Sequence, residues 1–173
     1  MGFCKEGTRR QETLHRSRAR GFSIERELTN LGREVLRTEH YSHNFLRVGH
    51  RPIGSAYHLE WDPAIPLESE KAQAKGIQLT SASLNFEQDE LENGIYFFSE
   101  PGKSLDLKMR FALSVPDAGL RLEIKPGRPV HRVAIWGGPL VICPEPFILI
   151  EVAPGQSEKW STEYRLKDIT SSE

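Results

Sequence analysis

The sequence predicts an all-β protein, an antiparallel β-sandwich, from two observations. Apolar and polar residues alternate over many short stretches, which is the pattern of half-buried strands. Turn-forming residues such as Pro116-Asp117-Ala118-Gly119 and Pro154-Gly155 separate these stretches, and no long stretch has the apolar period of a helix. With 173 residues, 38% of them hydrophobic and 27% charged, the chain is long enough for one folded domain.

The first residues of the chain differ from the rest. Residues 1–21 are basic, and their few apolar residues follow neither a helical nor a strand period. We therefore expect a solvated, disordered tail. A nucleic-acid arm or a targeting peptide is the alternative, but no aromatic platform accompanies the charge and Glu6 and Glu12 interrupt it. The β-sandwich domain is predicted over 22–168, with a second tail at 169–173.

In the first half of that domain, Phe22, Ile24 and Leu28 alternate with Ser23 and other polar residues, which predicts a strand. A turn should follow at 30–32, and two prolines favour a loop over 62–76, with a short helix over 68–74 as an option. The strands expected before this loop span 22–29, 34–40, 45–48 and 56–61.

The second half shows the clearest alternation, over 105–113, where Leu107, Met109 and Phe111 are interleaved with Lys108 and Arg110. The turn at 116–119 should join this strand to the next one as a hairpin. The other strands expected after the loop span 77–79, 81–86, 94–98, 120–124, 130–136, 140–152 and 157–166.

Charge and composition exclude several classes of protein. The formal net charge is −1, so no global field would draw nucleic acid or an anionic membrane. No apolar run approaches the roughly 18 residues of a membrane span, and residues 1–20 lack the apolar core of a signal peptide. The two cysteines, Cys4 and Cys143, make no disulfide framework. We therefore expect a cytoplasmic protein.

Two polar residues in apolar surroundings are candidate site residues. His43 lies in Tyr41-Ser42-His43-Asn44-Phe45, where an imidazole can exchange a proton with a ligand oxygen, although a locally satisfied structural histidine is the alternative. Glu145 lies between two prolines in an apolar strand. A carboxylate there is costly unless it is paired or solvated in a cleft, so a bent strand that aims it into a cleft is one interpretation. A glutamate facing solvent from an edge strand is the other.

The tryptophans and histidines suggest further candidates. Trp61, Trp136 and Trp160 can stack on sugar rings or fill the core, and we expect core filling for at least two of them. The four histidines close together suggest a zinc site, but their spacing fits no standard ligand set and neither cysteine is near them in sequence, so we expect no metal. These histidines are His40, His43, His50 and His58.

These pieces, in this order, resemble the galactose mutarotase (aldose 1-epimerase) superfamily. The resemblance rests on Leu28-Thr29-Asn30-Leu31-Gly32, on the segment from Tyr41 to Leu46, on Ile135-Trp136, on Cys143-Pro144-Glu145-Pro146-Phe147 and on the closing hairpin over 150–164. It covers about residues 22–166 and corresponds to the C-terminal half of the family's β-supersandwich.

The resemblance implies an isomerase that interconverts the anomers of a free aldose without metal or organic cofactor. It makes Glu145 the general base on the anomeric hydroxyl and His43 the general acid on the ring oxygen, on opposite sides of a hexose-sized space. Asn44, Trp136 and Tyr41 are the predicted sugar contacts.

Only part of the family domain is matched, so whether the chain is an enzyme stays open. The alternatives are a non-catalytic carbohydrate-binding β-sandwich, a truncated remnant of a mutarotase-like protein, and a fragment that self-associates or binds a partner through exposed sheet edges.

Overall fold

Antiparallel strands make up the protein in the computed structural model, which describes residues 7–16, 20–69 and 76–169. The strands are β1 (Thr8–Arg16), β2 (Gly21–Asn30), β3 (Leu36–His40), β4 (His58–Asp62), β5 (Ile77–Leu79), β6 (Ser83–Phe86), β7 (Ile95–Phe98), β8 (Arg110–Val115), β9 (Leu120–Pro126), β10 (Arg132–Gly138), β11 (Val141–Val152) and β12 (Ser157–Asp168). The described residues contain one short 3₁₀ turn, η1 (Pro116–Ala118), and no α-helix. The prediction of an all-β antiparallel fold is therefore confirmed.

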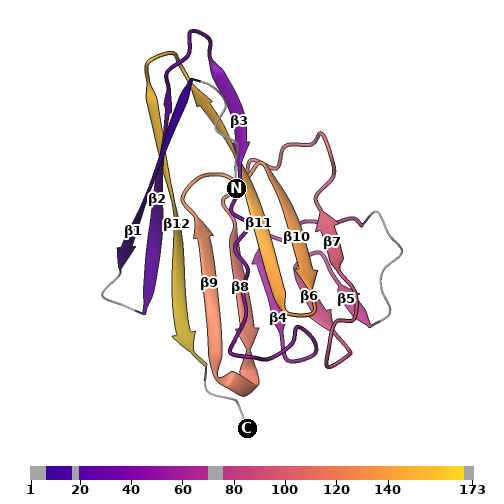
Figure 1. The fold of residues 1–173 in the computed structure, drawn as a ribbon. Helices are drawn as coiled ribbons and strands as arrows, with labels where there is room; N and C mark the ends of the chain where they lie inside the picture. The colour runs from indigo at the N-terminus through magenta and orange to yellow at the C-terminus, as the bar shows by residue number, and fades with distance from the viewer. Residues whose placement is uncertain (1–6, 17–19, 70–75, 170–173) are drawn as a thin grey trace.

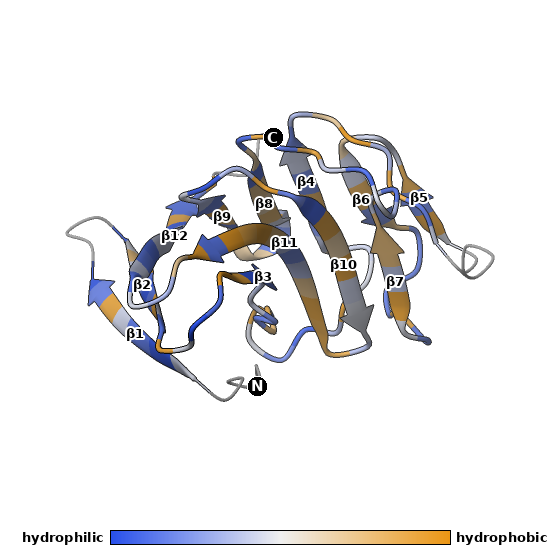
Figure 2. Ribbon diagram, turned by 90° about the horizontal axis from the view of Figure 1, so that it is seen from above, coloured by the Kyte–Doolittle hydropathy of each residue, from blue (hydrophilic) through white to orange (hydrophobic). Residues whose placement is uncertain are grey.

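The strands form two sheets that lie against each other (Figure 1). The larger sheet has the order β1-β2-β12-β9-β8-β4-β6-β5, and the smaller has the order β3-β11-β10-β7. Seen from above, the small sheet covers only part of the larger one, and β1 lies beyond it (Figure 2). In the described part of the chain no helix has the length and apolarity that a membrane crossing requires.

The core lies between the two sheets because alternate residues of each strand point inward. Leu59 and Phe111 of the large sheet pack in one cluster with Phe97, Ile135 and Ile142 of the small sheet. A second cluster, where β3, β11 and β12 meet, contains Ile150 and Trp160. Burial of this apolar area is the main contribution to the stability of such a sandwich.

Most of the predicted strands are present with shifted ends, but the predicted disordered tail is wrong for Thr8–Arg16. These residues form β1, which pairs along its whole length with β2. An ion pair lies at the centre of this ladder. Glu12 accepts a hydrogen bond from Arg26 at 2.7 Å, and the Arg26 side chain is only 4% exposed. The rest of the predicted tail, 1–6 and 17–19, and the predicted tail at 170–173 lie outside the described residues.

Two other strand predictions need correction. Residues 45–48 make only one bridge, between Leu46 and Ile142, and 105–109 make only one, between Leu107 and Val130. Asp106 has a φ of 49°, in the left-handed region, which breaks the extended backbone before β8 begins. The optional helix over 68–74 falls largely outside the described residues, and Glu68 instead forms a bridge with Phe98.

Asn30 joins two turns at one end of the sandwich. Its side-chain amide donates to the carbonyls of Glu34 and Val152, both at 2.8 Å, and its oxygen accepts from the Gly32 N–H at 2.9 Å. The side chain is buried, so these bonds are shielded from water. The Asn30-Leu31-Gly32 motif is thus explained by turn geometry.

Each sheet ends in two edge strands within the described residues, β1 and β5 in the large sheet and β3 and β7 in the small one. Self-association through these edges stays a prediction, and sedimentation as a clean monomer would contradict it.

Candidate active site

Strand β11 presents two different faces. Its odd-numbered residues Cys143 and Glu145 pair with Trp136 and Ala134 of β10, so their side chains share the face of the small sheet that points away from the large sheet, which we call the outer face. Its even-numbered residues, such as Ile142, point into the core. The candidate site therefore lies outside the sandwich, on the floor formed by β10 and β11.

His43 belongs to a segment that runs beside β11 without forming a ladder. The pairing of His40 with Ile148 and the bridge between Leu46 and Ile142 fix both ends of this segment. Counting inward from either end puts His43 opposite Glu145, so register alone brings the two residues together.

The two prolines explain why this segment is not a strand. Ile142 exchanges both backbone hydrogen bonds with Leu46, so the even-numbered residues of β11 direct their backbone groups to this edge. The next two even-numbered residues of β11 are Pro144 and Pro146, and proline has no N–H to donate. Two successive donors are missing, and β3 ends at His40, where the gap starts.

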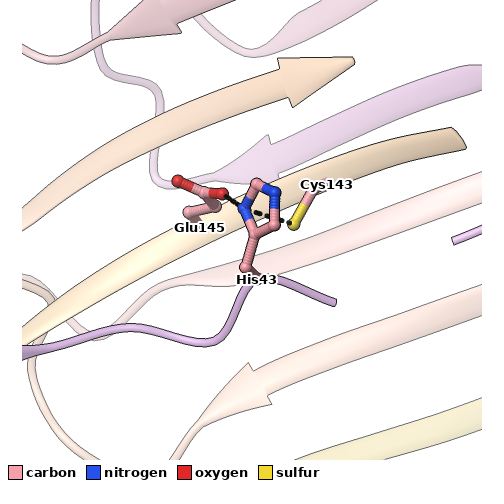
Figure 3. Close-up of side chains that lie close together, drawn as sticks. All are labelled: His43, Cys143 and Glu145. Carbon is pink, nitrogen blue, oxygen red and sulfur yellow. Dashed lines mark hydrogen bonds and ion pairs between the residues drawn. The ribbon is translucent and has the colours of Figure 1, made fainter. Parts of the chain in front are cut away.

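The His43 ring lies between Glu145 and Cys143 (Figure 3). Its Nδ1 contacts the Glu145 carboxylate directly and lies 3.7 Å from the Cys143 sulfur. The ring approaches from the loop, whereas the other two side chains rise from β11. Both contacts of the ring with these two side chains use Nδ1.

The imidazole covers the carboxylate. The Glu145 side chain is 6% exposed and the His43 side chain 38% exposed, and Cys143 is fully buried. Burial, followed by the charge of Glu145 and a hydrogen bond to it, raises the pKa of the Cys143 thiol well above its ordinary value. The thiol is therefore protonated at neutral pH.

Aromatic rings surround the pair on the outer face. The His43 ring centroid lies 4.6 Å from that of Phe45 and 5.5 Å from that of Trp136. Tyr41 stacks on Phe147 at 4.2 Å. Phe45 is 58% exposed and Tyr41 45% exposed, so the rings present an apolar surface to solvent beside the acid–base pair.

Four of the five predicted site residues gather on this face: His43, Glu145, Trp136 and Tyr41. Asn44 does not join them. It follows His43 in an extended segment, so its side chain points the other way and bonds the Tyr164 hydroxyl of β12, in a cleft between the sheets. The predicted hexose-sized space between His43 and Glu145 is also missing, because the two side chains are in contact.

The sequence reasoning missed Cys143, Phe45 and Arg132. Cys143 and Phe45 lie two residues from Glu145 and His43, and the period of two in extended chains is the signal that could have found them. Arg132 lies 3.4 Å above the Phe147 ring and forms an ion pair with Glu39 at 2.9 Å. No local pattern marks that position.

The four neighbouring histidines form no common site. Burial, followed by the charge of Arg26, lowers the pKa of His40 to about 4, and its ring contacts Trp160. His58 bonds Asn85 at 2.9 Å. Trp61 and Trp160 are buried in the core, as expected for two of the three tryptophans. A different group, His43, Cys143 and Glu145, brings possible metal-ligand atoms within 4.8 Å of one another.

Comparison with solved structures identifies the fold. A candidate aldose 1-epimerase from Klebsiella pneumoniae superposes with a TM-score of 0.68 at 12% identity, over 99% of this chain and 49% of its own. A protein from Synechocystis gives 0.62 at 14% identity, over 97% and 65%. A galactose mutarotase related enzyme from Lactobacillus acidophilus gives 0.61 at 12% identity, over 93% and 62%.

The chain therefore has the galactose mutarotase-like sandwich fold, as predicted, and spans about half to two thirds of the length of these structures. No protein-family model and no curated protein matches the sequence. At such low identity the likeness concerns the fold alone.

Proposed function

We propose that the outer face binds a monosaccharide and that His43 and Glu145 interconvert its anomers, as in an aldose 1-epimerase. The main support is the register that brings an imidazole and a buried carboxylate together beside exposed aromatic rings. The fold is shared with a candidate aldose 1-epimerase and a galactose mutarotase related enzyme, which agrees with this chemistry.

The pair suits the chemistry of ring opening. The Glu145 carboxylate accepts the proton of the anomeric hydroxyl while the His43 imidazolium donates a proton to the ring oxygen, and the bond between C1 and that oxygen breaks. The C1–C2 bond then rotates, and the reverse transfers close the ring on the other face. One proton enters the sugar and one leaves it, so no cofactor is consumed.

Sugar binding must first separate the two side chains. Glu145 is covered by His43, so the carboxylate reaches a sugar only when the imidazole swings outward. The missing donors of Pro144 and Pro146 make this movement possible at low cost, because the His43 segment can shift without breaking ladder hydrogen bonds between Ile142 and Ile148.

The aromatic rings would hold the sugar during this exchange. Trp136, Phe45 and Tyr41 lie around His43, and aromatic faces pack well against the C–H faces of a pyranose. Asn44 has no part in this contact, since its amide bonds Tyr164.

Anomer interconversion measured by NMR or polarimetry tests the proposal. Starting from one anomer of galactose, glucose and other hexoses, the protein should accelerate mutarotation above the buffer rate. Glu145→Gln and His43→Gln should each lower the rate by about 100-fold or more. His50→Gln is the matched control because the contact of His50 uses its backbone carbonyl, so its side chain is free to change. A rate equal to buffer for every hexose would refute the proposal.

Carbohydrate binding without turnover is the second candidate, and the near-complete burial of Glu145 favours it. In that case sugars should perturb the fluorescence of Trp136 with no acceleration of mutarotation. A Trp136→Phe variant identifies the signal, since Trp61 and Trp160 lie in the core. Absence of any response to sugars would count against both candidates.

A further inference from the structure

We propose that His43, Cys143 and Glu145 form a binding site for a zinc-class divalent metal ion. The three side chains offer an imidazole nitrogen, a sulfur and a carboxylate oxygen, all within 4.8 Å of one another (Figure 3). Nitrogen and sulfur donors favour zinc and its neighbours over magnesium or calcium, which prefer oxygen alone.

The separation of one donor pair, the His43 nitrogen and the Cys143 sulfur, fits tetrahedral coordination. Zinc bonds of about 2.3 Å to sulfur and about 2.05 Å to nitrogen hold these two atoms about 3.6 Å apart at the tetrahedral angle. The observed separation of His43 Nδ1 and Cys143 Sγ is 3.7 Å. A metal would enter between His43 and Glu145, replacing their direct contact, and the segment carrying His43 has the freedom to make room.

The local charges also favour a cation. Glu145 is 4% exposed, and its ion-pair partner among the described residues is His43, with no lysine or arginine within ion-pair distance. A buried carboxylate without a permanent positive partner is costly. A divalent ion bound by this carboxylate and a thiolate would be neutralised by two negative charges.

Three protein ligands leave one coordination position open. Because Cys143 and Glu145 are buried and the His43 side chain is 38% exposed, the open position would face the outer surface among the aromatic rings. Zinc sites with three protein ligands and a free position are typical of catalysis or ligand exchange, whereas structural sites use four.

Binding is balanced by loss of one proton. The Cys143 thiol gives its proton to solvent as the metal–sulfur bond forms, Glu145 binds through a carboxylate lone pair, and neutral His43 binds through Nδ1 in the tautomer that carries its proton on Nε2. The metal would use the same imidazole and carboxylate that the proton transfers need, so metal binding and anomer exchange would exclude each other. The metal site does not depend on the proposed epimerase function.

Titration with Co²⁺, the spectroscopic substitute for zinc, tests the site. A thiolate–cobalt charge-transfer band should appear in the near ultraviolet with one equivalent of Co²⁺, and Zn²⁺ should displace it. The band should vanish in Cys143→Ser, and the affinity should fall at least about tenfold in His43→Gln and Glu145→Gln. Cys4→Ser is the matched control, because it removes the other cysteine of the chain, and it should keep the band.

Absence of the band in the unaltered protein, or its persistence in Cys143→Ser, would overturn the inference. His43→Gln changes a partly exposed side chain, so a weaker band in this folded variant tests the site even where Cys143→Ser fails to fold. The mutarotation assay is run on metal-free protein, so failure of either proposal leaves the other measurable.

Discussion

Replacing Asn30 by alanine should destabilise the sandwich strongly although the residue lies far from any site. The side chain makes three hydrogen bonds to backbone groups of Gly32, Glu34 and Val152 and is 3% exposed. Each bond contributes about 1 kcal/mol net, so the free energy of unfolding should fall by about 3 kcal/mol. The backbone bonds of Asn30 to Gly155 and Gln156 stay intact in the variant.

Urea unfolding followed by fluorescence measures this loss, and the melting temperature should fall by roughly 6 to 12 °C for a chain of this size. Asn93→Ala is the matched control, since Asn93 is exposed, and it should change stability by less than about 0.5 kcal/mol. A loss below about 1 kcal/mol for Asn30→Ala would refute the claim that this side chain ties the two turns together.

Three further variants probe other parts of the fold by urea unfolding. Burial lowers the pKa of His40 to about 4, below the ordinary 6.5, so the unfolded chain takes up the proton first and the free energy of unfolding decreases as the pH is lowered from 6.5 to 4. His40→Gln should reduce this decrease by about 2 kcal/mol, and an unchanged pH dependence of stability would contradict the prediction. Glu12→Gln removes the counter-charge of buried Arg26 and should lower the free energy of unfolding by about 1 to 2 kcal/mol, with faster proteolysis in β1. If the variant resists protease as well as the unaltered protein, the ion pair does not stabilise β1. Ile150→Ala should cost about 2 to 5 kcal/mol as a core cavity, against a small effect for exposed Leu149→Ala, and similar losses in both would be inconsistent with the packing.

Strand positions could be predicted wherever one face of a strand is buried. The alternation of apolar and polar residues marks strands such as β9 and β12, because their two faces meet different surroundings. β1 carries no such mark, since nearly all its residues are exposed and its order depends on the ladder with β2 and on the contact between Glu12 and Arg26. Contacts between distant residues leave no local pattern.

The candidate site could be predicted in part. A histidine among aromatic residues and a glutamate in an apolar strand were recognisable from residue type and context, and the structure brings His43 and Glu145 together. Asn44 is next to His43 in sequence, yet neighbours in an extended segment face opposite sides. The direct contact could not be predicted, because it depends on where a segment outside the ladder comes to lie.

The two prolines of β11 have a consequence for how this protein could adapt to a ligand. Loops are usually mobile because they contain glycine. Here the segment that carries His43 can move because Pro144 and Pro146 of the neighbouring strand offer it no N–H donors, and its own composition does not indicate this mobility. One edge of β11 pairs with β10 at seven positions, whereas the other edge forms no ladder beside His43. Replacing Pro144 by a residue with an amide hydrogen would supply one missing backbone hydrogen bond and hold the segment that carries His43 in a fixed position.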